Sequence, residues 1–172
     1  MGDSRPGVVA AVDVHYPPSG GARAAAVLAA DASFARVVAE RVTTVEAVLG
    51  YRPGEFYLRE LPPLRTLLAS MDRPRLVVVD GYADLDPDGR PGLGAYVHAE
   101  FGMPVIGVAK SPFRTATHAV PVLRGASARP LLVTAAGLGR TEAADLVRRM
   151  AGPFRVPDAL RRADALARAR CG

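Results

Sequence analysis

Three acidic residues that are far apart in the sequence stand where apolar segments end, and together they could hold metal ions. Asp13 lies near the end of the first apolar run, Glu60 lies in a leucine-rich segment, and Asp80 follows the apolar run Leu76–Val79. Carboxylate oxygens are the ligands that Mg²⁺ prefers, and two such ions about 4 Å apart can align a water molecule and stabilise the leaving oxygen in phosphodiester hydrolysis. Each acid could instead only cap or solvate the end of its element, because spacing alone does not make the three converge.

Two further side chains could take part in the same chemistry. Lys110 is the single lysine of the chain and follows the apolar run Val105–Ala109. It could hold a scissile phosphate or polarise the attacking water, or it could extend into solvent. His15 lies two residues beyond Asp13, so on an extended strand both side chains share one face. It could add a nitrogen ligand or a base, or it could be a solvated residue at a strand end.

The segments that must position these residues form a mixed pattern. Apolar segments separated by short turns predict a three-strand antiparallel meander over Val8–Val14, Ala22–Ala30 and Phe34–Val45. The run from Arg75 to Gly81 predicts a strand that is buried on both faces and has parallel neighbours. Open α/β sheets bind ligands at the carboxyl ends of such strands, and Asp80 occupies that position.

The rest of the chain predicts further strands and helices. Strands are expected at Val105–Ala109, Thr115–Leu123 and Leu131–Ala135, and helices at Glu55–Ser70, Leu93–Phe101, Thr141–Met150 and Pro157–Arg170. Thr141 is the expected N-cap of its helix, and Pro62 and Pro63 predict a break or kink. The fold class is therefore α/β, a mixed sheet in which an antiparallel meander joins parallel strands, with helices on both faces. Residues 1–172 are expected to form a single domain.

Composition limits the classes of protein that the chain can represent. With 49% hydrophobic and 23% charged residues it has an ordinary globular composition, and its single cysteine excludes a disulfide framework. No apolar run approaches the roughly 20 residues that span a bilayer, and residues 1–7 lack the apolar core of a secretory signal, so a cytoplasmic protein without membrane contact is expected. The net charge of +5 suits a polyanionic partner, although a compositional preference for arginine would give the same charge.

Motifs in chain order resemble those of the endonuclease V family. The matching segments are AVDV at 11–14, GYRPG at 50–54, LRE at 58–60, VDGYA at 79–83, LG and a histidine over 93–98, PVIGVAK at 104–110, and the pattern R-x-P-x-x-x-R-x-A-D at 155–164. They cover almost the whole chain in the family's order. The resemblance implies an RNase H-like fold and an enzyme of DNA repair that hydrolyses a phosphodiester bond near deaminated adenine (hypoxanthine, inosine) in DNA or RNA.

The resemblance also implies roles for individual residues. Asp13, Glu60 and Asp80 would hold Mg²⁺, with Mn²⁺ as a possible substitute, and Lys110 would lie near the phosphate of a monomeric enzyme.

An enzyme that reads a single base must extrude it from the stack. The resemblance suggests that the ring of Tyr51 fills the gap that the base leaves, with Pro53 in the same loop, or else Tyr51 packs on its own domain. Gly54 and Gly81 would let the backbone approach the extruded base, since a side chain there would fill its pocket.

The chain departs from the family pattern at two places. Gly137 stands where the family's active-site histidine is expected, and Tyr82 replaces a histidine after the central strand. These losses favour the alternative of a diverged protein that binds nucleic acid without cutting it, while the three acids and Lys110 favour the enzyme. His118 and the acidic run Asp84–Asp88 are expected in solvent, without a role.

Overall fold

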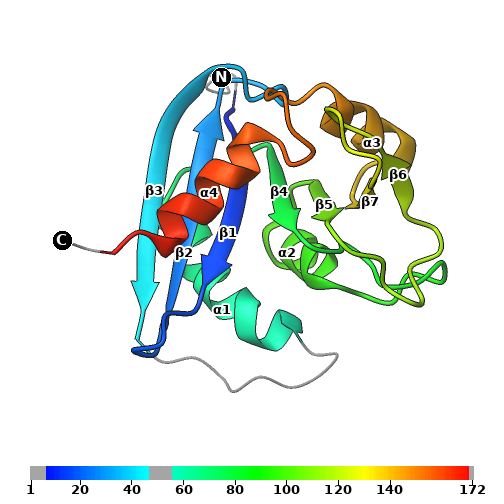
Figure 1. The fold of residues 1–172 in the computed structure, drawn as a ribbon. Helices are drawn as coiled ribbons and strands as arrows, with labels where there is room; N and C mark the ends of the chain where they lie inside the picture. The colour runs from blue at the N-terminus through cyan, green and yellow to red at the C-terminus, as the bar shows by residue number, and fades with distance from the viewer. Residues whose placement is uncertain (1–6, 47–55, 171–172) are drawn as a thin grey trace, which may run out of the picture.

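A computed structural model describes residues 7–46 and 56–170, and within these ranges it contains one seven-stranded sheet and four helices. The strands are β1 (Val9–His15), β2 (Ala22–Ala29), β3 (Val37–Val45), β4 (Leu76–Asp80), β5 (Val105–Ala109), β6 (Val120–Val122) and β7 (Leu131–Ala136). The helices are α1 (Phe56–Ala69), α2 (Leu93–Phe101), α3 (Arg140–Arg148) and α4 (Asp158–Arg168) (Figure 1). The expected α/β class is confirmed.

The sheet combines antiparallel and parallel pairs in the order β3-β2-β1-β4-β5-β7-β6. β1, β2 and β3 form the expected antiparallel meander, whereas β1, β4 and β5 run parallel. β7 then pairs antiparallel with β5 and with β6. The carboxyl ends of the three parallel strands therefore lie at one edge of the sheet.

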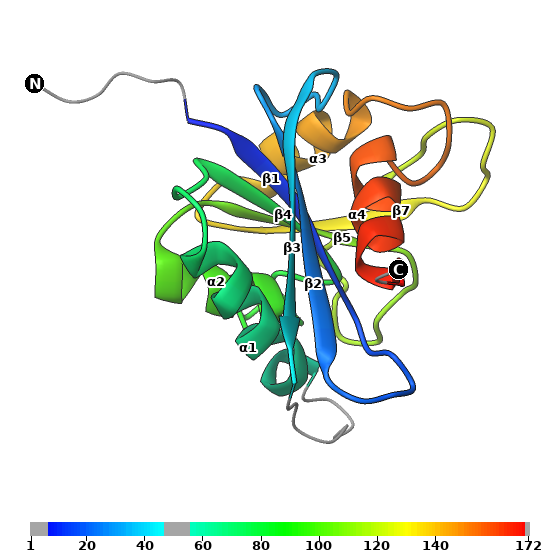
Figure 2. The ribbon, with the colours of Figure 1, turned by 90° about the vertical axis from the view of Figure 1, so that its left-hand side faces the viewer.

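Alternation along the strands divides the core into two layers. On β1, Val9 and Ala11 pack in one layer with buried residues of α3 and α4, and Ala10 and Val12 pack in the other with residues of α1 and α2. Figure 2 shows the corresponding arrangement, with α1 and α2 on one side of the sheet and α4 on the other. Because successive side chains of a strand point to opposite faces, the parity of a residue decides which pair of helices it meets.

The expected break in the first helix is wrong. α1 continues through Pro62 and Pro63, although each proline lacks the N–H that a helix interior uses. Leu64 and Leu67 follow directly and are buried against the sheet. This packing keeps the helix continuous, because tertiary burial of an apolar face contributes more to helix stability than any single backbone hydrogen bond.

Two smaller expectations also differ from the structure. Only Val120–Val122 of the expected strand 115–123 is a strand, since the preceding residues form turns in which the N–H of Ala116 donates to Phe113 O. Thr141 is not an N-cap, because α3 begins at Arg140 with Gly139 as its cap. Within the described residues, the helices are too short or too polar to cross a bilayer.

Candidate active site

Asp13 and Asp80 lie next to each other at the carboxyl edge of the parallel strands. In the register of β1 and β4, Val12 pairs with Val79, so each acid follows a paired residue. Asp13 shares the parity of Ala11, and Asp80 shares that of Val78, so both side chains face the layer of α3 and α4. The fold thus brings together two acids that are far apart in sequence.

Glu60 reaches the same place from α1. A small pocket is lined by the three acids together with apolar residues from β1, α1 and β4 (Val12, Leu64 and Val79 among them). The packing of Leu64 in the core fixes the helix beside the sheet, and Glu60 lies one turn earlier. Asp13, Glu60 and Asp80 therefore line one pocket, and their joint role as metal ligands stays a prediction.

The pKa values of two of these acids are raised, because both carboxyls are buried and lie close to other negative charges. Burial, followed by repulsion from Asp80, raises the pKa of Asp13 to about 7, although the N–H of Val14 donates to its Oδ1 at 2.9 Å. Burial and the charges of Asp13 and Asp80 raise the pKa of Glu60 to about 7 as well. The protein holds desolvated carboxylates that repel one another, an arrangement that a cation would relieve.

Lys110 supplies a positive charge to this site. Its Nζ donates to Asp80 Oδ2 at 2.7 Å from the loop position that follows β5. Burial alone would lower the pKa of the ammonium, but the hydrogen bond and the charges of Asp80 and Asp13 raise it overall. Lys110 is therefore protonated at neutral pH and compensates one of the acids.

Asp164 of α4 is a fourth acid of the site, and sequence reasoning assigned it no role. A hydrogen bond joins its carboxylate to the carboxyl of Asp13. Burial alone would raise the pKa of Asp164, but hydrogen bonds from Arg168 and Asp13 lower it overall, and Arg168 Nε donates to Asp164 Oδ1 at 2.6 Å. Asp13 accordingly carries the shared proton. The signal for Asp164 was its place at the end of the 155–164 motif.

The donor set fits a divalent cation in chemistry and charge. Asp13, Glu60, Asp80 and Asp164 offer carboxylate oxygens, and burial followed by mutual repulsion raises the pKa values of Asp13 and Glu60. No three acidic, histidine or cysteine side chains in residues 7–46 and 56–170 are grouped as ligands of one ion, however. A cation at these acids would compete with Lys110 for Asp80 and with the proton that the raised pKa of Asp13 favours.

His15 ends β1 on the same strand face as Asp13 and is half-buried. It pairs across the ladder with Arg23 of β2. Its place is compatible with the expected one at the margin of the site, and nothing in the described contacts gives it a ligand role.

A cavity of about 330 Å³ adjoins the acids and is lined mainly by apolar groups. Its lining residues are Glu60, Asp80, Gly81, Tyr82, Leu85, Gly92, Leu93, Ser111, Pro112 and Phe113. Gly81 has a φ of +126°, which side chains rarely adopt, and a Cβ there would project into open space. Of the four residues expected to contact a base, Gly81 lies at this cavity, and Tyr51, Pro53 and Gly54 lie outside the described residues.

Two side chains tie together the loops that border this cavity. The hydroxyl of Tyr82 donates to Ser111 O at 2.7 Å, and its ring packs on Phe113 with centroids 5.8 Å apart. His118 is not in solvent as expected: its side chain is only 4% exposed, and its Nε2 lies 2.8 Å from Asp84 Oδ1. Tyr82, Ser111 and Phe113 therefore form part of the cavity wall, whereas His118 and Asp84 do not line the cavity and pair with each other beside it.

The missing histidine at position 137 does not leave a gap among the acids. Ala136, the last residue of β7, pairs with Val105, the first residue of β5, whereas Lys110 follows the last residue of β5. Gly137 therefore lies at the opposite edge of the sheet, where a Cβ would come within 2.5 Å of the His98 ring. The argument from this position for a protein that no longer cuts is wrong.

Comparisons with known proteins agree with this fold. The family model for Endonuclease V matches residues 2–141. Endonuclease V of Streptomyces coelicolor is 35% identical over 188 residues, which cover 95% of this chain and 78% of the relative. The crystal structure of endonuclease V from Streptomyces avermitilis superposes with a TM-score of 0.79 at 31% identity and covers 96% of this chain and 84% of that chain. Human ENDOV gives a TM-score of 0.75 at 25% identity over 96% of this chain and 84% of its own.

The shared architecture is RNase H-like, with the mixed sheet and two-sided helices described above. The family match spans most of the chain and includes the segments that carry Asp13, Glu60 and Asp80, whereas Asp164 lies beyond it. This chain belongs to the endonuclease V family, a family of hydrolytic endonucleases.

Proposed function

We propose that this protein is a metal-dependent endonuclease of DNA repair that hydrolyses a phosphodiester bond near hypoxanthine in DNA or RNA. The observation that carries this proposal is the gathering of carboxylates from β1, α1, β4 and α4 beside an apolar cavity. Desolvated acids that repel one another are costly to a fold, and a function that uses their charge explains why they occur together.

In this proposal Asp13, Glu60 and Asp80 hold Mg²⁺, with Mn²⁺ as a substitute, and Asp164 adds a fourth carboxylate. When bound, the metal would supply Lewis-acid activation of water and neutralise charge on the phosphate. The chain's own part is to orient these oxygens and to release the proton of Asp13, whose raised pKa of about 7 permits the release near neutral pH.

Lys110 changes partners in this proposal. The ammonium pairs with Asp80 in this structure, and if Asp80 held a cation the ammonium would be free to donate to a phosphate oxygen. The raised pKa of Lys110 favours the charged form that this contact needs. His15, on the same strand face as Asp13, is a second candidate for proton transfer, and unchanged cutting by His15→Ala would remove it from the site.

The cavity beside the acids is proposed to take the extruded base. Its apolar wall suits a flat heterocycle, and it shares Glu60 and Asp80 with the acid pocket, so a base bound there lies next to its own phosphodiester backbone. Tyr51 with Pro53 would fill the gap in the stack, Gly54 would let the backbone approach the base, and Gly81, where a Cβ would meet nothing within 4 Å, lines the cavity. An endonuclease V from Ciona intestinalis, which has this fold at 20% identity and a TM-score of 0.80, was crystallised with a 23mer DNA containing an inosine followed by a ribo-adenosine.

We further propose that residues 1–172 act as a single-domain monomer in the cytoplasm, without a membrane partner. The continuous sheet, with a core layer on each side, supports one folding unit.

The deciding experiment incubates the purified protein with Mg²⁺ and a labelled strand that contains a single inosine. We expect one nick near the inosine, none in the matched strand with adenosine, and none in chelator. Asp80→Asn should abolish the nick, whereas Asp145→Asn, which removes an exposed acid of α3 paired with Arg148, should not. Binding of the inosine strand without any nick would favour the alternative of a binding protein.

A further inference from the structure

A groove of about 690 Å³ lies beside α4, on the face of the sheet to which Asp13 and Asp80 point. Lys110, the segment that precedes α4, and α4 itself line it, with Phe154, Arg155, Val156, Asp158, Leu160, Arg161, Arg162 and Asp164. The function proposed above uses only Lys110 and Asp164 from this set. The rest of the groove therefore has no assigned task.

The groove carries a large aromatic side chain that the core does not use. Phe154 is 56% exposed, more than a side chain of this size usually is in a stable fold. The guanidinium of Arg161 lies over its ring, 4.5 Å from the centroid. An arginine that stacks on an exposed ring holds that ring in place and leaves much of its surface open to a third planar group.

Arg161 differs from the neighbouring arginines in its partners. Arg162 donates to both carboxylate oxygens of Glu40, and Arg155 donates to carbonyl oxygens, including that of Lys110. The side chain of Arg161 has no hydrogen bond or ion pair with any residue in the described part of the chain, and its contact is the ring of Phe154. Its charge is therefore available to an anion from outside.

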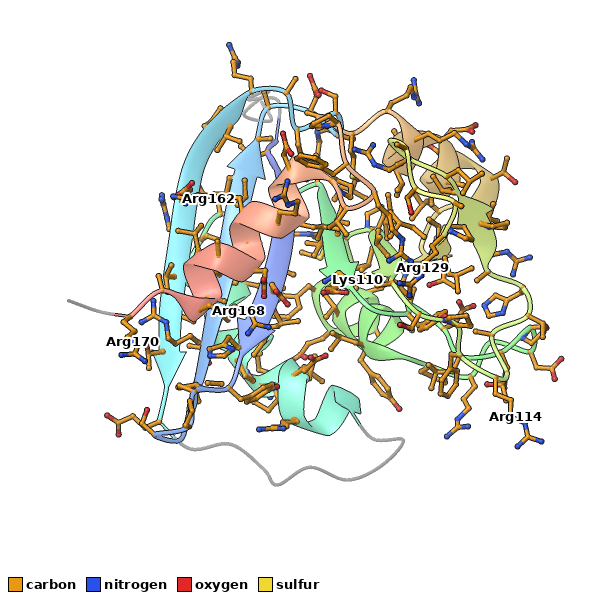
Figure 3. All side chains as sticks on the ribbon, in the orientation of Figure 1. Lys110, Arg114, Arg129, Arg162, Arg168 and Arg170 are labelled. Carbon is orange, nitrogen blue, oxygen red and sulfur yellow. The ribbon has the colours of Figure 1, made fainter. Side chains whose placement is uncertain are left out.

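The groove is continuous with the acid pocket. Lys110 contacts Asp80 and Asp164 contacts Asp13, and both residues also line the groove. In Figure 3 the labelled basic residues extend from Arg170 and Arg168 at the end of α4, past Lys110, to Arg129. A chain of phosphates that leaves the acid pocket along α4 would thus follow positive charge.

We propose that this groove binds the single-stranded segment of nucleic acid adjoining the scissile phosphate, with one base stacked on Phe154 and one phosphate paired with Arg161. This inference rests on the proposed function only for its anchor, the phosphate beside Lys110. An aromatic platform combined with a basic wall is the recognition chemistry of unpaired strands, because every base has a face that can stack. Phe154 and Arg161 then set affinity for the strand irrespective of the damaged base.

The test measures binding by fluorescence anisotropy, in chelator, with a mixed-sequence DNA single strand that lacks inosine. We expect Phe154→Ala to weaken binding about tenfold, since one stacked base is lost, and Phe154→Tyr to restore it. Arg161→Ala should weaken binding about fivefold and lower the slope of log affinity against log salt by about 0.7, the share of one phosphate contact. Phe154→Ala should leave that slope unchanged.

Two matched controls separate the groove from general surface effects. Arg73→Ala removes an exposed arginine from the opposite edge of the sheet, next to Gly102, and Val42→Ala trims an exposed apolar residue of β3. Both should bind like the parent protein. The proposal would be overturned if Phe154→Ala bound the strand as tightly as the parent protein. It would also be overturned if Arg73→Ala and Arg161→Ala lost the same amount of affinity.

Failure of the groove and failure of the proposed function give different results. If the parent nicks an inosine strand and Phe154→Ala binds undamaged strands normally, the function stands and the groove inference is lost. If the parent protein never nicks but Phe154→Ala and Arg161→Ala bind the strand weakly, the groove inference holds and the proposed endonuclease function is lost. Strands truncated on either side of the inosine provide a further check, because the Phe154→Ala defect should disappear when the nucleotides that fill the groove are removed.

Discussion

Arg124 and the acid pocket are both sites of buried charge, and they differ in how the charge is satisfied. The guanidinium of Arg124, only 6% exposed, donates to the carbonyl oxygens of residues that end α3 and lead to α4: Val147, Arg148, Met150, Gly152 and Arg155. Burial lowers its pKa, yet its donors have partners. In the acid pocket, by contrast, Asp13 and Glu60 face other carboxylates. A buried charge with partners stabilises a fold, and one without them is available for chemistry.

The largest expected effect tests the acid pocket. Asp80→Asn keeps the shape of the side chain and removes its charge, so we expect the single-turnover rate on an inosine strand to fall about a thousandfold or more, because a metal site commonly supplies several kcal/mol to the transition state. Thermal unfolding should stay within a few degrees of the parent protein. If the variant is both inactive and unfolded, Asp80 is a structural charge like Arg124, and the difference between the two sites disappears.

Arg124→Met should have the opposite profile. It leaves the carbonyl oxygens at the end of α3 without donors in a buried place, and we expect a loss of about 3 kcal/mol in the free energy of unfolding, or roughly 10 °C in melting temperature. The single-turnover rate of the folded fraction should be unchanged. Arg149→Met, which alters an exposed arginine at the end of the same helix, is the control and should melt with the parent protein.

The pH dependence of stability should sharpen the same contrast. A carboxyl whose folded pKa lies above its unfolded value binds protons more tightly in the folded state, so its stabilising contribution is complete below pH 4 and is lost as pH rises through the folded value. For Asp13 and Glu60 that value is about 7. In chelator, Asp13→Asn should therefore be about 2 kcal/mol more stable than the parent at pH 8 and about equal to it at pH 4, by denaturant titration. A constant difference at both pH values would contradict the repulsion described for the pocket.

The smallest expected effect concerns a position outside both regions. Gly137→Ala introduces a Cβ at a φ of +80° and against the His98 ring, which should lower the free energy of unfolding by about 1 kcal/mol. Because the residue lies at the opposite sheet edge, the rate of cutting by the folded protein should not change. A rate loss larger than the stability loss explains would show that this edge communicates with the acids.

The sequence was sufficient for the sheet and for the strand ends at which Asp13 and Asp80 lie, for a physical reason. Runs of β-branched residues such as Val77–Val79 exclude most alternatives to a buried strand, and a carboxylate directly after such a run must lie at the sheet edge. The strands at Leu76–Asp80 and Val105–Ala109 were accordingly predicted nearly residue by residue.

What the sequence did not reveal depends on contacts between distant segments. The amphipathic pattern predicted α4 but not the strand end that its Asp164 would meet, because periodicity fixes a helix face and not the place where the helix docks. His118 gave no sign that it would be buried against Asp84. Pro62 and Pro63 predicted a break that the helix does not have, since the burial of neighbouring leucines outweighed the low helix propensity of proline.

The docking of α4 has a consequence for the way in which this protein folds. Arg23 of β2 donates to Ala167 O at 3.0 Å between residues that are 144 positions apart, and Asp13 of β1 bonds Asp164. Contacts between residues so distant in sequence form late in folding, because a long loop must close before they contribute. If Asp164 belongs to the cutting machinery, a partly folded chain in which α4 has not yet docked would have an incomplete set of carboxylates and an unfinished groove.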